Sequence, residues 1–195
     1  MSVMLDHALL ADIRAARPGL RLETAESRTR EYQRDETDFI PYGQPLAVAF
    51  PTSTEDVSAV VRACAAHKVP VVARGGGSGL SGGANAMDGW VVLATAGMDR
   101  ILEIDAANLV VVTQPGVITA DLEAAVEAEG LMYPPEPASH ELSVIGGNIA
   151  ENAGGLRCVK YGVSRDYVLG LEVVLADGEV IRVGGRNVKD VMGYD

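Results

Sequence analysis

The chain has 195 residues, of which 48% are hydrophobic and 22% charged, and its formal net charge is −11. This composition allows a sizeable core in one large domain or two small ones and excludes a disordered chain. The acidic excess argues against a nucleic-acid-binding protein, which normally carries a basic face, so we expect no nucleic-acid partner.

The cysteines and the apolar runs indicate the compartment. Cys64 and Cys158 are the only two cysteines and form no CxxC spacing, which indicates a reducing compartment without a disulfide framework. The N-terminus lacks the basic start and apolar run of a signal peptide. No stretch approaches the ~18 apolar residues of a membrane span. We therefore expect a cytoplasmic protein.

The first 73 residues predict a helix, an irregular segment and a strand–helix–strand unit. Residues 1–19 are amphipathic and predict a helix that ends near Pro18-Gly19. Residues 21–45 are charged and turn-rich, and predict an irregular, solvated lead-in, so that residues 1–45 precede the main domain. Strands are expected at 46–50 and 69–73.

The helix between these strands has clear start and face signals. Thr52 and Glu55 have the spacing of a capping box. Apolar residues at positions 57, 60, 61, 64 and 65 fall on one helical face. Cys64 is therefore expected in the core.

The remaining chain is richer in strands. The apolar runs predict strands within residues 90–95, 100–105 and 109–117. A helix is expected from Thr119 to Gly130, where glycine is a typical C-terminal residue. Residues 167–185 predict a hairpin with Asp177-Gly178 as its turn. Because there is no long run of alternating strands and helices, the fold class is α+β.

Six glycines lie in the nine residues from Gly75 to Gly83. A Walker A loop is excluded because no lysine follows these glycines at the required place. The dinucleotide fingerprint GxGxxG does match, but it must open a helix, and the turn-rich residues before Trp90 leave no room for one.

A loop of successive N–H groups that forms a concave nest for a diphosphate fits this segment better. Glycine suits such a nest because no Cβ blocks the ligand and a positive φ is free of strain. Ser78 and Ser81 add hydroxyl donors. Backbone donors would also let a chain of net charge −11 bind a dianion.

A second glycine-rich region surrounds a short helix-like stretch, with Gly146-Gly147-Asn148 before it and Gly154-Gly155 at its end. Two such regions about 70 residues apart suggest two walls around one extended ligand. The alternative is that each region is only a tight turn, and it stays open at this point.

Several motifs together resemble a known family. They are PVVARGGGSGLSGGA, VVVTQPGV, YPPEPAS, SVIGGNIAENAGG, VKYGVSRDYVLGLEVVLADGEVIRVGG and NVKDVMGYD. In this order they resemble the p-cresol-methylhydroxylase-type (PCMH-type) FAD-binding domain of the FAD-linked oxidases. The resemblance is closest to the FAD subunit of glycolate oxidase and to D-2-hydroxyacid (D-lactate) dehydrogenases, and it covers nearly the whole chain from about Leu46.

The resemblance implies a PCMH-type fold of two α/β subdomains, with mixed and antiparallel sheets flanked by helices. The first subdomain would span about residues 46–115 and the second about 116–195. In this family the domain continues beyond the position of Asp195 and a substrate domain follows. We therefore expect an incomplete second subdomain and an absent substrate domain. The chain would be the first part of a longer enzyme, a deliberately shortened form or a natural truncation.

The resemblance also implies which residues contact FAD. The first glycine loop would hold the pyrophosphate, and the segment from Pro137 through Gly155 would line the isoalloxazine and ribityl parts, with Gly162 nearby. The full implied set is Arg74, Gly75, Gly76, Gly77, Ser78, Gly79, Leu80, Ser81, Pro137, Ser143, Gly146, Gly147, Asn148, Gly154, Gly155 and Gly162. Ser78 and Val144 each stand where the family commonly has Thr. Because the first loop contains neither His nor Cys, we expect the FAD to be non-covalent.

The activity implied by the resemblance is oxidation of a 2-hydroxy acid of the glycolate or D-lactate type to the 2-oxo acid, by hydride transfer to FAD. An electron acceptor or partner subunits would be needed, and such subunits could hold the protein at the inner membrane. The alternatives are a flavin reductase of the UDP-N-acetylenolpyruvoylglucosamine type, or a non-catalytic FAD-binding remnant or assembly subunit. We expect residues 1–195 alone to be inactive.

No catalytic residue is named from the sequence. His140 lies in the proline-rich loop near the implied flavin wall and is a candidate base. Arg157, Lys160 and Arg165 are either carboxylate-steering groups or ordinary surface charges. No zinc or iron–sulfur ligand pattern is present, so no metal is expected.

Overall fold

The computed structural model describes residues 2–186 and contains two compact units. Unit 1 comprises residues up to Gly97 together with Glu172–Ile181, and unit 2 comprises Met98–Leu171 together with the residues from Arg182 on. The motif at residues 187–195 lies outside the described part of the chain.

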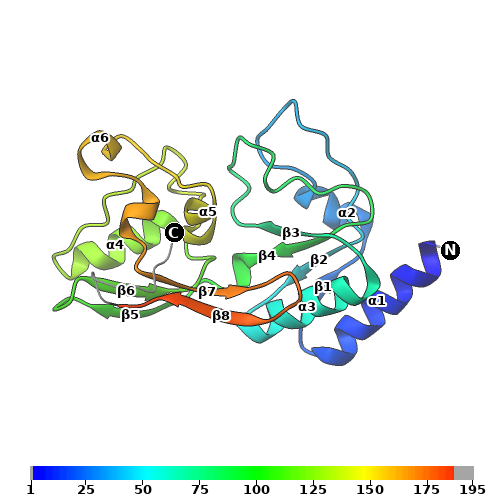
Figure 1. The fold of residues 1–195 in the computed structure, drawn as a ribbon. Coiled ribbons are helices and arrows are strands. Elements are labelled where there is room, and N and C mark those ends of the chain that lie inside the picture. The colour runs from blue at the N-terminus through cyan, green and yellow to red at the C-terminus, as the bar shows by residue number, and fades with distance from the viewer. Residues whose placement is uncertain (1, 187–195) are drawn as a thin grey trace. The chain divides into compact units, whose positions relative to one another are not determined.

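Unit 1 is built on a four-stranded mixed sheet (Figure 1). Its strands, in spatial order, are β1 (Arg21–Glu23), β2 (Ala47–Phe50), β4 (Val91–Ala94) and β3 (Val71–Arg74). β2, β4 and β3 are parallel, whereas β1 pairs antiparallel with β2. β2 and β4 are buried along their whole length, as is typical of parallel strands covered on both faces. The three strands predicted in this region are confirmed.

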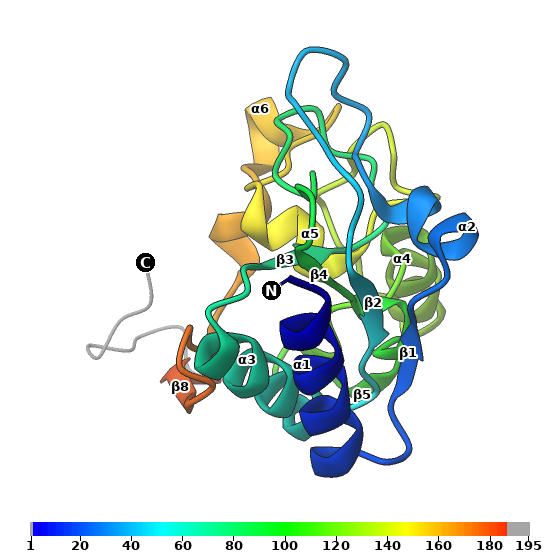
Figure 2. The same ribbon diagram turned by 90° about the vertical axis from the view of Figure 1, so that its right-hand side faces the viewer.

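Two helices cover one face of this sheet, α1 (Ser2–Ala16) and α3 (Thr54–His67). Leu9 and Ile13 of α1 and Val60 and Cys64 of α3 are fully buried in the same cluster, and Figure 2 shows the two helices side by side. Cys64 therefore is a core residue, as predicted. The other face is packed by Tyr32 of the 3₁₀ turn Arg30–Tyr32 and by the loop residues Ala86 and Trp90.

The prediction of an irregular, solvated lead-in at 21–45 is correct for only part of this segment: residues 33–45 contain no helix or strand, and most residues of 21–45 are exposed or half-buried. The segment contains β1, the helical turn α2 (Glu26–Thr29) and a 3₁₀ turn at Arg30–Tyr32, and it buries Asp35 and Thr37. A three-residue strand is too short to show an alternating pattern. In the sequence, polar residues that are buried against a distant loop cannot be distinguished from polar residues that are exposed to solvent.

The start of α3 differs from the predicted capping box by one residue. The N-cap is Ser53, whose Oγ accepts from the Asp56 N–H at 3.2 Å. The chain contains two overlapping Ser/Thr-x-x-acidic patterns here. The second prevails because Asp56 Oδ2 also accepts from the Thr52 N–H and Oγ1, at 2.9 and 3.0 Å.

Unit 2 contains the antiparallel hairpin β5 (Ile101–Asp105) and β6 (Val110–Thr113) and three helices. The helices are α4 (Thr119–Ala128), α5 (Ile145–Ala150) and the single turn α6 (Cys158–Tyr161). Its core is formed by Val117, Leu122, Val126 and Ile145. Gly130 has a φ of 73° just after α4, as expected of a C-terminal glycine.

The predicted C-terminal hairpin is confirmed as β7 (Gly170–Val174) and β8 (Val180–Gly184). Gly178 in its turn has a φ of 82°, and the Gly178 carbonyl accepts from Ser58 Oγ at 2.6 Å. The α+β class with mixed and antiparallel sheets is therefore confirmed. Among residues 2–186, no helix combines the length and the apolar character that crossing a membrane requires.

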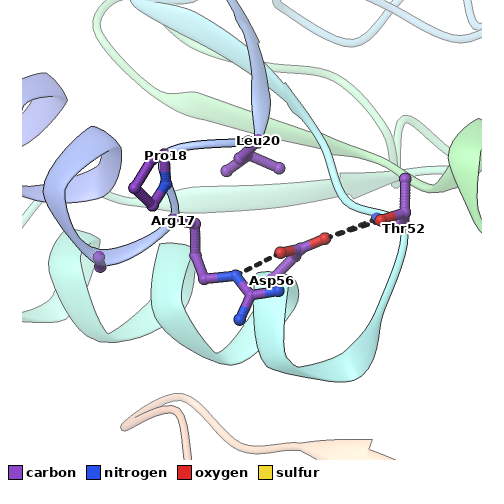
Figure 3. A pocket seen from close by; sticks show the side chains of 7 residues that line it. Arg17, Pro18, Leu20, Thr52 and Asp56 are labelled. Carbon is purple, nitrogen blue, oxygen red and sulfur yellow. Dashed lines mark hydrogen bonds and ion pairs between the residues drawn. The ribbon is translucent and has the colours of Figure 1, made fainter.

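An ion pair between a partly exposed arginine and a buried carboxylate joins the end of α1 to the start of α3 (Figure 3). Arg17 Nε donates to Asp56 Oδ1 at 2.6 Å, and the Asp56 side chain is only 7% exposed. Burial raises the pKa of Asp56, but the Thr52 hydrogen bonds and Arg17 outweigh it and hold the pKa below its ordinary value of 3.8. The Asp56 carboxylate is therefore charged at neutral pH, and its hydrogen bonds and ion pair stabilise the folded state.

Replacing Asp56 with asparagine should lower the free energy of unfolding by about 1.5–3 kcal/mol at neutral pH, because bonds to a charged group are lost. A group with a lowered folded pKa contributes stability above its ordinary pKa, and this contribution is lost as the pH falls. The deficit of Asp56→Asn should therefore shrink below pH 3.8. Urea titrations across this range measure it.

Glu26→Gln is the matched control, since the Glu26–Arg30 pair is exposed and should contribute little. A deficit of Asp56→Asn that equals that of the control, or that does not change with pH, would contradict the assigned role.

Candidate functional site

The first glycine loop leaves the carboxyl end of β3, the edge at which open sheets with parallel strands place their ligands. Residues 75–90 contain neither helix nor strand. This confirms the prediction that the GxGxxG match does not open a helix. Gly77 and Gly82 have φ values of 75° and 77°, a conformation that favours glycine. Residues 75–81 are half-buried or exposed, so the loop can be reached by a ligand.

A cation lies against this loop. The guanidinium of Arg74 occupies the space where a Cβ on Gly77 would lie. Arg74 Nη1 donates to the Arg34 carbonyl at 2.5 Å, and the guanidinium lies over the Tyr32 ring, 5.6 Å from its centroid. Burial lowers the pKa of Arg74, while nearby acidic groups act in the opposite direction. Arginine stays charged at neutral pH, so the loop carries a fixed positive charge.

In unit 2, Thr119 at the start of α4 connects two of the implied FAD residues, Ser143 and Asn148. Its Oγ1 accepts from Asn148 Nδ2 at 2.7 Å and lies 3.0 Å from both the carbonyl and the hydroxyl of Ser143. All three side chains are at least 95% buried. The hydrogen-bonding groups of Ser143 and Asn148 named here therefore face the protein interior, where they fix the backbone around the start of α5.

Different structural requirements account for the glycines of the second segment. A Cβ on Gly146 would lie 2.6 Å from Pro115 Cβ, and one on Gly155 would overlap the Glu136 carbonyl. Gly162 has a φ of 88°. These three glycines are required by the protein's own packing or backbone.

Gly147 and Gly154 differ from these three. The nearest atom to a Cβ on Gly147 is Val144 Cγ2 at 3.7 Å, and a Cβ on Gly154 would make contacts of 3.4–3.6 Å. Both are ordinary contact distances. Gly147 also lies within α5, where alanine would be the better helix former. The chain's own packing therefore gives no reason for glycine at position 147.

The remaining implied residues are placed as follows. Pro137 begins a turn in which its carbonyl accepts from the His140 N–H at 2.9 Å. Leu80 is 74% exposed at the tip of the first glycine loop. Ser81 is exposed and Ser78 is half-buried in the same loop.

His140 is paired with an acidic residue. His140 Nδ1 donates to Glu123 Oε2 at 3.1 Å, and this bond raises the pKa of His140. Glu136 pairs in turn with Arg157 at 3.1 Å. Ligand atoms of Glu123, Glu136 and His140 lie within 4.8 Å of one another. Because these residues already form ion pairs, we assign neither a metal nor a base role to them.

The other two candidate steering residues have local contacts. Lys160 Nζ donates to the Tyr161 hydroxyl at 3.0 Å, and the Arg165 backbone N–H donates to Asn152 Oδ1 at 3.0 Å. Arg157, as described, is paired with Glu136. Nothing in these contacts assigns the three residues to substrate binding.

A pocket of about 260 Å³ lies where α1 ends, and it is lined by residues 16–20, Thr52 and Asp56 (Figure 3). It includes none of the implied FAD residues. The polar groups of Arg17, Thr52 and Asp56 bind one another there, so the pocket belongs to the junction of α1 with α3.

Residues 45–184 match the sequence profile of the FAD binding domain family, including both glycine segments. The chain belongs to this family. FAD is thus the cofactor of the family domain, and the glycine segments are its candidate contact sites.

Named relatives agree with this assignment. Glycolate oxidase subunit GlcD of Bacillus subtilis is 55% identical over 77% of this chain, which spans 32% of that protein. D-2-hydroxyglutarate dehydrogenase of Stutzerimonas stutzeri is 41% identical over 98% of this chain, which spans 41% of it. The chain therefore spans about a third to two fifths of these relatives.

Solved structures confirm the fold. p-Cresol methylhydroxylase with substrate bound has a TM-score of 0.78 and 23% identity, and the match covers 93% of this chain and 36% of that one. The predicted PCMH-type fold is therefore confirmed for the FAD-binding domain.

The sequence did not indicate the residues that hold these segments in place. Thr119 was predicted only as the start of a helix, and Asp35 was assigned to a solvated segment. Asn85 lies in the turn-rich residues before Trp90, and its Oδ1 accepts from the Asp35 N–H at 2.9 Å. Each is a small polar residue whose partner is distant in sequence, so no local pattern marks it.

Replacing Thr119 with valine should lower the free energy of unfolding by about 1–3 kcal/mol, because buried Asn148 Nδ2 loses its acceptor. Thr119→Ser keeps the hydroxyl and loses one methyl group, which costs about 1 kcal/mol. Urea unfolding of both variants measures the difference. If the serine variant is as unstable as the valine variant, packing of the methyl group rather than the hydroxyl fixes this region.

Proposed function

We propose that this chain binds FAD non-covalently, with the loop Gly75–Ser81 holding the pyrophosphate and residues of the segment Pro137–Gly162 holding the flavin and ribityl part. The observation that carries the proposal is Gly147. It is a glycine inside a helix, where a Cβ would make only an ordinary contact of 3.7 Å with Val144 Cγ2, so the protein's own packing does not require glycine. Close approach of a ligand to the backbone explains it.

The first loop supplies the groups that a diphosphate needs. Positive-φ glycines let successive backbone N–H groups converge, and Arg74 adds a fixed charge beside them. Charge-assisted hydrogen bonds to phosphate are stronger than neutral ones. The residues present therefore fit the cofactor of the family.

We propose further that the complete protein oxidises a 2-hydroxy acid to the 2-oxo acid. The relatives named above as glycolate oxidase and D-2-hydroxyglutarate dehydrogenase, together with D-lactate dehydrogenase of Anaerostipes hadrus at 40% identity, support this substrate class. Bound FAD would supply the redox chemistry. The contribution of this chain is to bind and orient FAD.

The name of one relative and the state of the cysteines bear on partners and compartment. The name of the Bacillus subtilis relative describes a subunit, so we propose that this protein also works with partner subunits. Both described cysteines are free, and burial raises the pKa of the Cys64 thiol to about 11. Free cysteines suit the proposed cytoplasmic location.

Gly147→Ala separates ligand contact from folding. If FAD approaches this backbone, the added methyl group should weaken FAD binding about tenfold or more, because overpacking costs about 1–3 kcal/mol. Stability without FAD should stay equal or rise by about 0.5–1 kcal/mol, since alanine favours a helix. FAD titration beside thermal unfolding measures both.

Gly19→Ala is the control, because a Cβ there has no neighbour within 4 Å and the residue lies outside both glycine segments. It should change neither quantity. Unchanged FAD affinity in Gly147→Ala would argue against flavin contact at this position.

The non-covalent mode is tested by acid denaturation. The first glycine loop contains no His or Cys that could attach the flavin. After FAD loading, acid precipitation and centrifugation, we expect the yellow colour in the supernatant. Colour that remains in the protein pellet after washing with denaturant would show a covalent bond.

A further inference from the structure

We infer that residues 33–44, called here the strap, are part of the pyrophosphate site, and that Asn85 and Asp35 are positioning residues for the first glycine loop. The inference rests on the proposed function. The strap lies outside the matched family region, which begins at residue 45. It also lies in the segment for which the sequence predicted only solvated chain.

The strap runs along the glycine-rich loop and is bonded to it at both ends, as the two views in Figures 1 and 2 allow the reader to follow. The Gln33 carbonyl accepts from the Ala86 N–H at 2.9 Å, and the Gly43 N–H donates back to the Ala86 carbonyl at 2.7 Å. The Gln44 carbonyl accepts from the Gly89 N–H at 3.0 Å. Ala86 is fully buried, so its two bonds to the strap are shielded from water.

Asn85 holds the middle of the strap. Its Oδ1 accepts from the Asp35 N–H at 2.9 Å, and its Nδ2 lies 3.3 Å from the Ile40 carbonyl and 3.4 Å from the Pro41 carbonyl. The residue is 6% exposed. One side chain thus satisfies three backbone groups of the strap from within the loop that the strap covers.

The strap in turn fixes the orientation of a peptide group in the glycine loop. The Glu36 N–H donates to the Gly79 carbonyl at 3.0 Å. Asp35 Oδ1 accepts from the Thr37 N–H at 2.9 Å, and Asp35 Oδ2 lies 3.3 Å from the position of a Cβ on Gly79. Asp35 therefore shapes the turn that presents the Glu36 N–H to the loop.

The Glu36–Gly79 bond also orients a backbone N–H that can bind an anion. In a planar trans peptide the carbonyl and the following N–H point in opposite directions. Because the Gly79 carbonyl faces the strap, the Leu80 N–H faces away from it. The strap therefore turns the Leu80 N–H outward as a donor, in the same loop that Arg74 approaches at Gly77.

The test uses wild-type protein and variants, with ADP as a pyrophosphate ligand without flavin and riboflavin as a flavin without phosphate. FAD binding is measured first. Asn85→Ala should weaken ADP binding about tenfold and leave riboflavin binding within about twofold. Asn108→Ala is the matched control, since Asn108 bonds only to a turn in unit 2 at Asp105 in the contacts described for it. It should change neither affinity.

A second pair of variants avoids the buried asparagine. Glu36 is exposed, and Glu36→Pro removes the N–H that donates to Gly79, whereas Glu36→Ala keeps it. Glu36→Pro should weaken ADP binding about three- to tenfold and Glu36→Ala should not.

The outcomes separate the inference from the function on which it rests. Wild-type protein that fails to bind FAD overturns the proposed function and the inference with it. Wild-type protein that binds FAD, with ADP affinity unchanged in both Asn85→Ala and Glu36→Pro, overturns the inference alone. An equal loss of ADP and riboflavin binding in these variants also overturns it, because it shows a general loss of folding.

Discussion

Both glycine segments depend on one constraint: at several positions the local backbone leaves no room for a Cβ or has a φ that only glycine adopts easily. At Gly77 the backbone has a φ of 75°, and at Gly155 a Cβ would overlap the Glu136 carbonyl. These glycines would be needed without any ligand, so a cluster of glycines is not in itself evidence of a binding site. Gly147 is informative for the opposite reason, since no described protein atom approaches it closely enough to exclude a methyl group.

The acidic character of the chain is compatible with an anionic cofactor because the charges are arranged locally. Arg74 is bonded to a backbone carbonyl and lies over an aromatic ring, and the acidic groups of Asp35 and Glu36 nearby favour its charged form. Asp35 is buried nearby, but its Oδ1 is bonded to a backbone N–H of the strap. The surroundings of the loop therefore contain charges of both signs, whereas the net charge of −11 is a property of the whole chain.

The sequence predicted those parts of the fold that arise from local patterns. β2 and β4 were visible as apolar runs, and α3 was visible as a periodic face, because burial on a sheet or helix face repeats along the chain. The strap was not visible. Its key contact joins Asp35 to Asn85, 50 residues apart, and the Thr119–Asn148 contact spans 29 residues. The glycine segments themselves were found because glycine is enriched in the sequence, whereas the polar residues that orient them are individually ordinary.

Thr119 and Asn85 solve the same physical problem in the two units. The Asn85 amide lies in the glycine-rich loop and bonds three backbone groups of the strap, whereas the Thr119 hydroxyl bonds the Ser143 carbonyl and the side chains of Ser143 and Asn148. A single buried hydroxyl or amide provides several of these bonds at once, in surroundings where an unpaired group is costly. Removing such a residue leaves several groups unsatisfied together. The rigidity that a dinucleotide requires of a glycine loop is therefore a property of these supporting side chains, which the cofactor need not touch.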